Sequence, residues 1–175
     1  MNLARCFFCS LLCVVWSVSF AAQKSDTVPV NLLDHLTGNW VLQGTIAGKQ
    51  TTHDVQATWV LNREYVQLHE ISREKNNAGG PAYEAIVYLS WDDKTQQYTC
   101  MWLDSTAGGG LSVEGLAHGK LAVDSIPLIF TISPSDQIHT TFRYEKTSDT
   151  WQWLIDDVGN GQTHRFADVT LTRVK

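Results

Sequence analysis

The chain has 175 residues, of which 43% are hydrophobic and 18% are charged. This length and composition suit one globular domain with a substantial core and exclude an intrinsically disordered chain. The 18 Asp and Glu residues outnumber the 13 Lys and Arg residues, and no basic cluster offsets them. An acidic balance of this kind disfavours nucleic acid and anionic membranes as partners.

Residues 1–21 have the features of a secretory signal peptide. Arg5 supplies the positive charge near the start, and the stretch 6–20 is apolar apart from its serines. Small residues, Ser19 and Ala21, occupy positions −3 and −1 of a cleavage site. We expect cleavage after Ala21 and export to the periplasm or the medium, with a net charge of 12 − 18 = −6 once Arg5 is lost. A retained anchor is disfavoured because the apolar run is shorter than the ~20 residues that a membrane span needs.

Cysteine usage fits a domain held by its core rather than by disulfides. Three of the four cysteines lie in the predicted signal peptide, so Cys100 alone remains after cleavage and no internal disulfide can form. No histidine lies within four residues of Cys100. We therefore expect a buried, inert thiol rather than a nucleophile.

Residues 22–35 are expected to form a polar leader, in which residues 31–36 could make one helical turn that caps the bottom of a barrel. From residue 38 onward, runs of alternating apolar residues are separated by turn residues, which is typical of strands joined by hairpins. The predicted strands are 39–46, 52–61, 64–72, 83–91, 97–103, 111–117, 120–124, 127–132, 137–146, 150–157 and 163–174.

Short turns join most of these runs, and no helix is long enough to connect parallel strands. There is no linker, repeat or low-complexity stretch after residue 36. We therefore predict that residues 36–175 form one all-β domain, a single antiparallel up-and-down β-barrel of about ten strands.

The two ends of this domain offer a way to close the barrel. Gly38-Asn39-Trp40 opens the first strand, and Arg173 ends the last one, where apolar residues alternate along one face. A guanidinium can stack on an indole while its aliphatic stem stays buried. We predict that Trp40 and Arg173 pair in this way.

Gly38-Asn39-Trp40 together with the late Arg173 resembles the calycin superfamily of lipocalins and fatty-acid-binding proteins. A closer resemblance, to the bacterial lipocalin-like proteins of domain-of-unknown-function family 1579, rests on Arg63-Glu64-Tyr65, Gly80-Pro81-Ala82-Tyr83-Glu84, Tyr88-Leu89-Ser90-Trp91-Asp92, Tyr98 and Trp102-Leu103-Asp104-Ser105. The sequence departs from that family's pattern at Ala85 and Ser90, which replace glycines, and at Trp91, which replaces a tyrosine. The resemblance implies a ten-stranded barrel with an interior cavity and no established activity.

Strand alternation suggests which side chains could bind a ligand inside such a barrel. In the run 64–72 the two faces are not distinct, and an inner face with Tyr65 and His69 is one way to line a cavity. Asp104 could anchor a ligand, although an Asp before a Gly-rich loop more often caps the turn. The candidate ligand-binding residues are Trp59, Tyr65, His69, Trp102, Asp104, Arg143 and Trp153.

The sequence predicts no metal site, cofactor or catalytic residue. The six histidines show none of the spacings that bind metals. His164 could be considered for haem, but it alternates with apolar residues and is expected to point outward. A serine hydrolase framework is lacking as well.

The function that fits these patterns is an exported lipocalin-like barrel that binds a small, mostly apolar molecule. Two alternatives remain open at this point: a hydrolase or isomerase hosted in the cavity, and a structural or interaction protein whose barrel is filled by side chains. The oligomeric state is not predicted.

Overall fold

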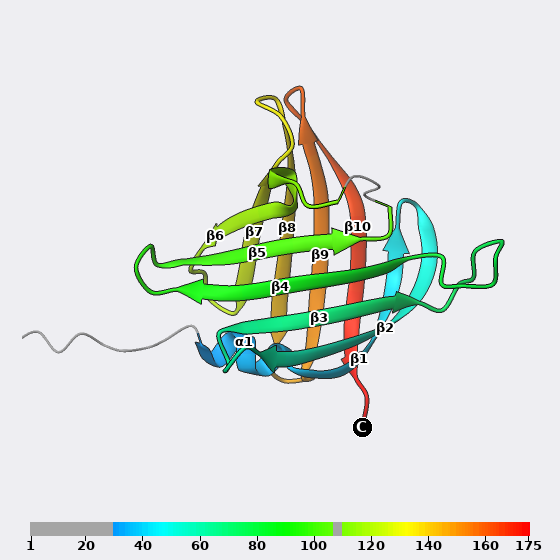
Figure 1. Cartoon of the computed structure of the whole chain (residues 1–175), viewed down its shortest axis with the longest axis horizontal. Coiled ribbons are helices and arrows are strands. Elements are labelled where there is room, and N and C mark those ends of the chain that lie inside the picture. The colour runs from blue at the N-terminus through cyan, green and yellow to red at the C-terminus, as the bar shows by residue number, and fades with distance from the viewer. Residues whose placement is uncertain (1–29, 107–109) are drawn as a thin grey trace, which may run out of the picture.

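The computed structural model describes residues 30–106 and 110–175. The predicted signal peptide and residues 22–29 of the predicted leader lie outside these residues. Within them, ten antiparallel strands close into one barrel, in which each strand pairs with the next and β1 closes against β10 (Figure 1). The predicted up-and-down barrel is therefore confirmed.

A short helix, α1 (Val30–Leu36), precedes the barrel. The strands are β1 (Gly38–Ile46), β2 (Lys49–Val60), β3 (Tyr65–Ser72), β4 (Glu84–Asp92), β5 (Gln97–Asp104), β6 (Leu116–Lys120), β7 (Ser125–Thr131), β8 (Asp136–Glu145), β9 (Thr150–Gly159) and β10 (Gln162–Arg173). A single 3₁₀ turn, η1 (Val113–Gly115), stands before β6.

Two details of the predicted strands are wrong. The runs 111–117 and 120–124 are not two strands, because η1 occupies the first and only Leu116–Lys120 pairs as β6. Leu61, expected to end the predicted strand 52–61, lies in a turn with φ at +48° and is 69% exposed. Residues 61–63 all have positive φ, so Leu61 belongs to the tight turn between β2 and β3, although its apolar side chain suggests a strand position.

The alternation of each strand explains its place in the barrel. In β10, Ala167, Val169 and Leu171 are buried, whereas the residues between them are exposed. Side chains of a strand point to opposite faces in turn, so one face of every strand fills the interior. The core is built from these inward rows together with two leucines of α1.

Helix α1 closes one end of the barrel (Figure 1). Its Leu33 and Leu36 are buried against the strands. The last carbonyl groups of a helix have no partner within the helix. Here the indole of Trp40 donates to the Leu36 carbonyl at 2.8 Å, and that of Trp151 donates to the His35 carbonyl at 3.4 Å.

Arg173 completes this closed end. Its guanidinium lies over the Trp40 ring at 4.0 Å from the centroid, as the sequence predicts. It also donates to the carbonyls of Thr37 at 2.7 Å and His35 at 3.0 Å, and its Nε donates to Asp149 at 2.5 Å. These bonds hold the pKa of Asp149 below its usual value, with the Arg173 hydrogen bond as the largest cause.

Gly38 explains the spacing of the Gly-Asn-Trp motif. Its φ is +135°, a conformation that side chains with a Cβ rarely adopt. A Cβ at this position would collide with Nη1 of Arg173. Glycine therefore leaves the space that lets the guanidinium reach the Trp40 ring.

Candidate functional site

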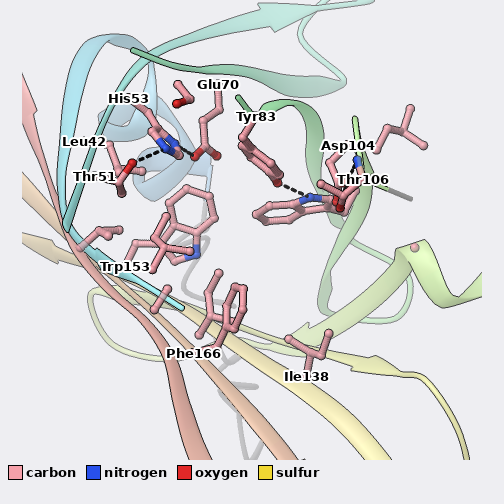
Figure 2. A pocket seen from close by; sticks show the side chains of 18 of the residues that line it. Leu42, Thr51, His53, Glu70, Tyr83, Asp104, Thr106, Ile138, Trp153 and Phe166 are labelled. Carbon is pink, nitrogen blue, oxygen red and sulfur yellow. Dashed lines mark hydrogen bonds and ion pairs between the residues drawn. The ribbon is translucent and has the colours of Figure 1, made fainter. Parts of the chain in front are cut away.

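The half of the barrel away from α1 is hollow. A cavity of about 1110 Å³ opens there, and the residues that line it come from both sides of the barrel and from the loop before β6. Figure 2 shows this cavity from close by. Its two walls differ in chemistry.

One wall, formed by β1 and β7 to β10, is almost entirely apolar. Trp153 is its largest side chain and stacks on Phe142 with ring centroids 4.4 Å apart. The indole N–H of Trp153 donates to Thr140 Oγ1 at 2.7 Å, so this tryptophan brings no unsatisfied donor into the cavity. The other members are Leu42, Ile46, Phe130, Ile132, Ile138, Ile155, Phe166, Ala167 and Val169. We call this set the apolar wall.

The opposite wall, formed by β2 to β5 and the segment between β3 and β4, is polar. His53 and Glu70 lie at its centre; they are 4% and 3% exposed, and Nδ1 of His53 hydrogen-bonds to Glu70 Oε1. The other ring nitrogen, Nε2, lies 2.8 Å from Thr51 Oγ1. A buried carboxylate is costly unless it is paired, and this contact explains how Glu70 can occupy an inward position of β3.

Glu74 extends this network toward the mouth of the cavity. It accepts hydrogen bonds from Ser72 Oγ at 2.6 Å, Thr51 Oγ1 at 3.0 Å and the Thr52 backbone N–H at 3.1 Å. These bonds lower the pKa of Glu74 to about 2, with the Ser72 hydrogen bond as the largest cause. The carboxylate is therefore ionised at neutral pH.

Tyr83 stands in the middle of the polar wall, between Glu70 and Asp104 (Figure 2). Its ring stacks on His53 with centroids 5.8 Å apart, and its hydroxyl accepts a hydrogen bond from the Trp102 indole at 3.2 Å. Burial is the largest cause that raises the pKa of Tyr83 well above its usual range, and the charges of Glu70 and Asp104 raise it further. The phenol is neutral, a donor and acceptor facing the cavity.

Asp104 caps a turn, as its sequence suggests, and lies in the wall of the cavity. Its Oδ1 accepts hydrogen bonds from the backbone N–H of Thr106 at 2.7 Å and from the Thr106 hydroxyl at 2.6 Å, which fixes the turn after β5. The residue also lines the cavity. The same residue therefore caps the turn and forms part of the cavity wall.

Three of the predicted ligand-binding residues line the cavity, namely Trp102, Asp104 and Trp153. The remaining four do not. Trp59 lies at the closed end, where its indole donates to Asp34 of α1 at 2.7 Å and Arg63 covers its ring. Arg143 is exposed on the outside of β8.

Tyr65 and His69 also lie on the outer surface, so the expectation that their face of β3 lines the interior is wrong. The buried residues of β3 are Val66, Leu68, Glu70 and Ser72. His69 instead hydrogen-bonds to Glu84 outside the barrel, at 2.7 Å. Two buried polar residues on the inward row hid the alternation that the apolar pair Val66 and Leu68 had indicated.

The central residues of the polar wall were missed by the sequence analysis. A signal for them was present, because His53 shares the alternation of Val55 and Ala57, and Glu70 shares that of Val66 and Leu68. Tyr83 shares the alternation of Ala85 and Val87 in the predicted strand 83–91 too, although it lies just before the observed β4. The pairing of His53 with Glu70 joins positions 17 residues apart and follows only from the β2–β3 register.

Other expectations concern single residues. Cys100 is buried, and burial raises the pKa of its thiol well above its usual range, which fits an inert thiol. His164 is exposed, as expected. Among the residues that the structure describes, no group of three or more His, Cys, Asp or Glu side chains is arranged to hold a metal ion.

No protein-family model matches the chain, and no curated protein matches it either. The resemblance to the lipocalin-like family therefore stays a prediction. In residues 30–106 and 110–175, no helix has the length and apolar character needed to cross a membrane.

Proposed function

We propose that the protein is an exported lipocalin-like barrel that binds a small, mostly apolar molecule in its cavity. The observation that carries this proposal is the cavity itself: about 1110 Å³ enclosed by an apolar wall on one side and a wall with a few convergent polar groups on the other. Pockets of this size and lining are typical of small-molecule sites.

Binding would rest on simple physical terms. The apolar wall excludes water, and the faces of Trp102 and Trp153, whose ring centroids lie 5.3 Å apart, supply contact area. Hydrogen-bonding groups on the polar wall, such as the Tyr83 hydroxyl, orient the ligand. A barrel filled by side chains is disfavoured as an alternative because the described lining encloses so much space.

Equilibrium titration with an uncharged naphthylamine fluorophore tests the proposal. Its emission should rise and saturate at about one probe per chain when it enters the cavity. Ile155→Trp, which adds a large ring on the inward face of β9, should abolish the rise. Leu154→Trp, the neighbouring outward position, is the matched control and should bind like the wild type. Identical titrations of both variants would contradict cavity binding.

A second function is favoured by one specific observation. Thr51, His53 and Glu70 place a hydroxyl, an imidazole and a carboxylate in a row within the polar wall. An imidazole oriented by a carboxylate is the usual general base of hydrolases and of isomerases that move protons. The Thr51 hydroxyl lies within hydrogen-bond distance of both Glu74 and His53. When it donates to His53, the arrangement supports a cavity-hosted enzyme in which His53 abstracts a proton.

His53→Gln separates the two functions. If His53 is a general base, the variant should lose turnover of chromogenic esters or of enolisable ketones while it still binds the fluorophore. Thr51→Val is a useful companion, because it removes the hydroxyl but keeps the shape of the side chain. Absence of turnover in the wild-type protein would leave binding as the function.

A further inference from the structure

The charge of the cavity is one-sided. Four carboxylates line it, those of Glu70, Glu74, Asp104 and Glu114, against the single ammonium of Lys49. Lys49 is exposed in the β1–β2 hairpin, at the rim rather than within the cavity. No arginine occurs among the described residues of the lining. His53 also lines the cavity, but it is already paired with Glu70. An anionic ligand would therefore meet repulsion inside and, among the described residues there, no unpaired cation.

The carboxylates lie at defined places on the polar wall. Glu70 of β3 and Asp104 of β5 are both register partners of Ala85, one on each side of β4. Neighbouring strands are about 4.8 Å apart, so the two backbones stand roughly 10 Å apart. In the gap between them Ala85 is buried and does not line the cavity, and the Tyr83 side chain covers this stretch of the wall (Figure 2).

Negative charge from both carboxylates reaches this gap. Both raise the pKa of the Tyr83 phenol, in addition to the effect of burial. Oε1 of Glu70 is paired with His53. Asp104 uses Oδ1 for the turn and shows no hydrogen bond at Oδ2 within the described residues. A hydrogen-bond donor placed here would find an acceptor on each side.

Aromatic faces complete the environment for a positive charge. Trp102 borders the gap, because its indole donates a hydrogen bond to Tyr83. The Trp153 ring, which belongs to the apolar wall, lies next to the Trp102 ring. Cations are attracted to the faces of such rings, most strongly where water is excluded. An apolar wall alone would accept any apolar group, so the carboxylates of the polar wall determine the chemical class of the ligand.

We propose that the ligand is an apolar organic cation: a flat or bulky apolar body lies against the apolar wall, and a protonated amine lies beside the Tyr83 hydroxyl, between Glu70 and Asp104. This inference rests on the proposed binding function and specifies its ligand. The cavity is the site, and the carboxylates select what it accepts. Fatty acids and other anionic amphiphiles are poor ligands on this account.

A matched set of ligands tests the selectivity. Pyrene bearing a methylamine, a methanol or a carboxylate group presents one apolar body with a positive, neutral or negative charge at neutral pH, and pyrene emission reports binding. We expect the amine to bind about 10- to 100-fold more tightly than the alcohol, the range of one or two charge-assisted hydrogen bonds. The carboxylate should bind most weakly, and added salt should narrow these differences.

The variants Asp104→Asn and Glu70→Gln test whether these two carboxylates cause the preference for the amine. Both replacements keep an acceptor oxygen for the existing hydrogen bonds, to Thr106 and to His53, and should therefore fold. The use of two independent variants keeps the test valid if one of them does not fold. Each should reduce the preference for the amine over the alcohol about tenfold or more. Glu64→Gln, an exposed carboxylate in the turn at the α1 end, removes the same charge and should leave this preference unchanged.

The possible results separate this inference from the function on which it rests. Saturable binding of all three ligands with equal affinity, or with the carboxylate tightest, would overturn the cationic ligand and leave the binding function intact. Saturable binding of none of them would overturn both. A preference for the amine that persists in both Asp104→Asn and Glu70→Gln would overturn the placement of the charge.

Discussion

At the α1 end, three side chains donate hydrogen bonds to backbone acceptors. Trp40, Trp151 and Arg173 bond to the last carbonyls of α1 and its following turn. At the cavity end, the buried polar groups include the ionisable side chains of His53 and Glu70, which pair with each other beside open space. One set of contacts ties the fold together, while the other lines a space that a ligand can enter.

The comparison teaches where stability and function lie in this molecule. At the closed end, aromatic and apolar side chains fill the barrel. The hydrogen-bond donors there satisfy the carbonyl groups that have no partner within the helix at its C-terminal end. The cavity end retains buried ionisable groups that add little net stability and are better explained by what they can hold. Residue substitutions at the two ends should therefore have separable effects.

The largest expected effect on stability is at Trp40, which is 1% exposed. Trp40→Ala should lower the free energy of unfolding by about 3–5 kcal/mol, because it leaves a void and removes the surface on which Arg173 lies. Ile138→Ala, in the apolar wall, should cost less than about 2 kcal/mol, because the deleted atoms border space that is already open. Urea denaturation of both variants measures the difference, and equal losses would contradict the contrast between the two ends.

Gly38→Ala should cost about 1–3 kcal/mol of unfolding free energy. The added Cβ would collide with the Arg173 guanidinium in a backbone conformation that alanine rarely adopts. Gly48→Ala is the control, since Gly48 also has a positive φ, +75°, but a Cβ there meets nothing within 4 Å. We expect this control to lose only about 1 kcal/mol, the cost of the left-handed conformation alone. Similar losses for both variants would argue against the packing role of Gly38.

Acid should weaken the polar wall through Glu74. The folded protein lowers the pKa of this carboxyl from 4.5 to about 2, so its ionised form stabilises the fold above about pH 4.5, and this contribution is lost as the pH falls toward 2. Since the side chain is 47% exposed, the effect should stay below about 1 kcal/mol. Urea midpoints between pH 7 and pH 2 should fall less steeply for Glu74→Gln than for the wild type. Parallel curves would show that Glu74 is not coupled to folding.

The smallest expected effect sharpens the comparison at the closed end. Tyr98 is fully buried on β5, burial raises its pKa to about 12, and its hydroxyl has no hydrogen-bond partner among the described residues. Tyr98→Phe should therefore keep the free energy of unfolding or raise it by up to about 1 kcal/mol. A clear loss of stability, measured by urea denaturation, would reveal a partner for this hydroxyl.

The closed end was predictable from sequence because its signals are local or lie at the two ends of the domain. Gly38, Trp40 and Arg173 stand at the ends of the first and last strands, which must be neighbours in a closed barrel. Alternation also placed Trp102, Asp104 and Trp153 on inward faces, and all three line the cavity.

The polar wall was less predictable because alternation was interpreted through hydrophobicity. An inward row that ends in Glu70 and Ser72 looks like an outward one unless the partner of each polar group is known. That partner is His53 for Glu70 and Glu74 for Ser72, and both contacts depend on register or on a loop conformation. His69 was chosen instead because it lies among polar residues, a pattern that here marks the outer surface.

Native mass spectrometry of the protein purified from its own source without detergent tests the central claim, that the cavity holds a ligand, most directly. We predict a non-covalent adduct on the order of a few hundred daltons, the size that such a cavity can hold. The adduct should be present on the wild type and on Leu154→Trp, and absent from Ile155→Trp. Bare wild-type protein, together with a failure of all three pyrene ligands to bind, would contradict the claim.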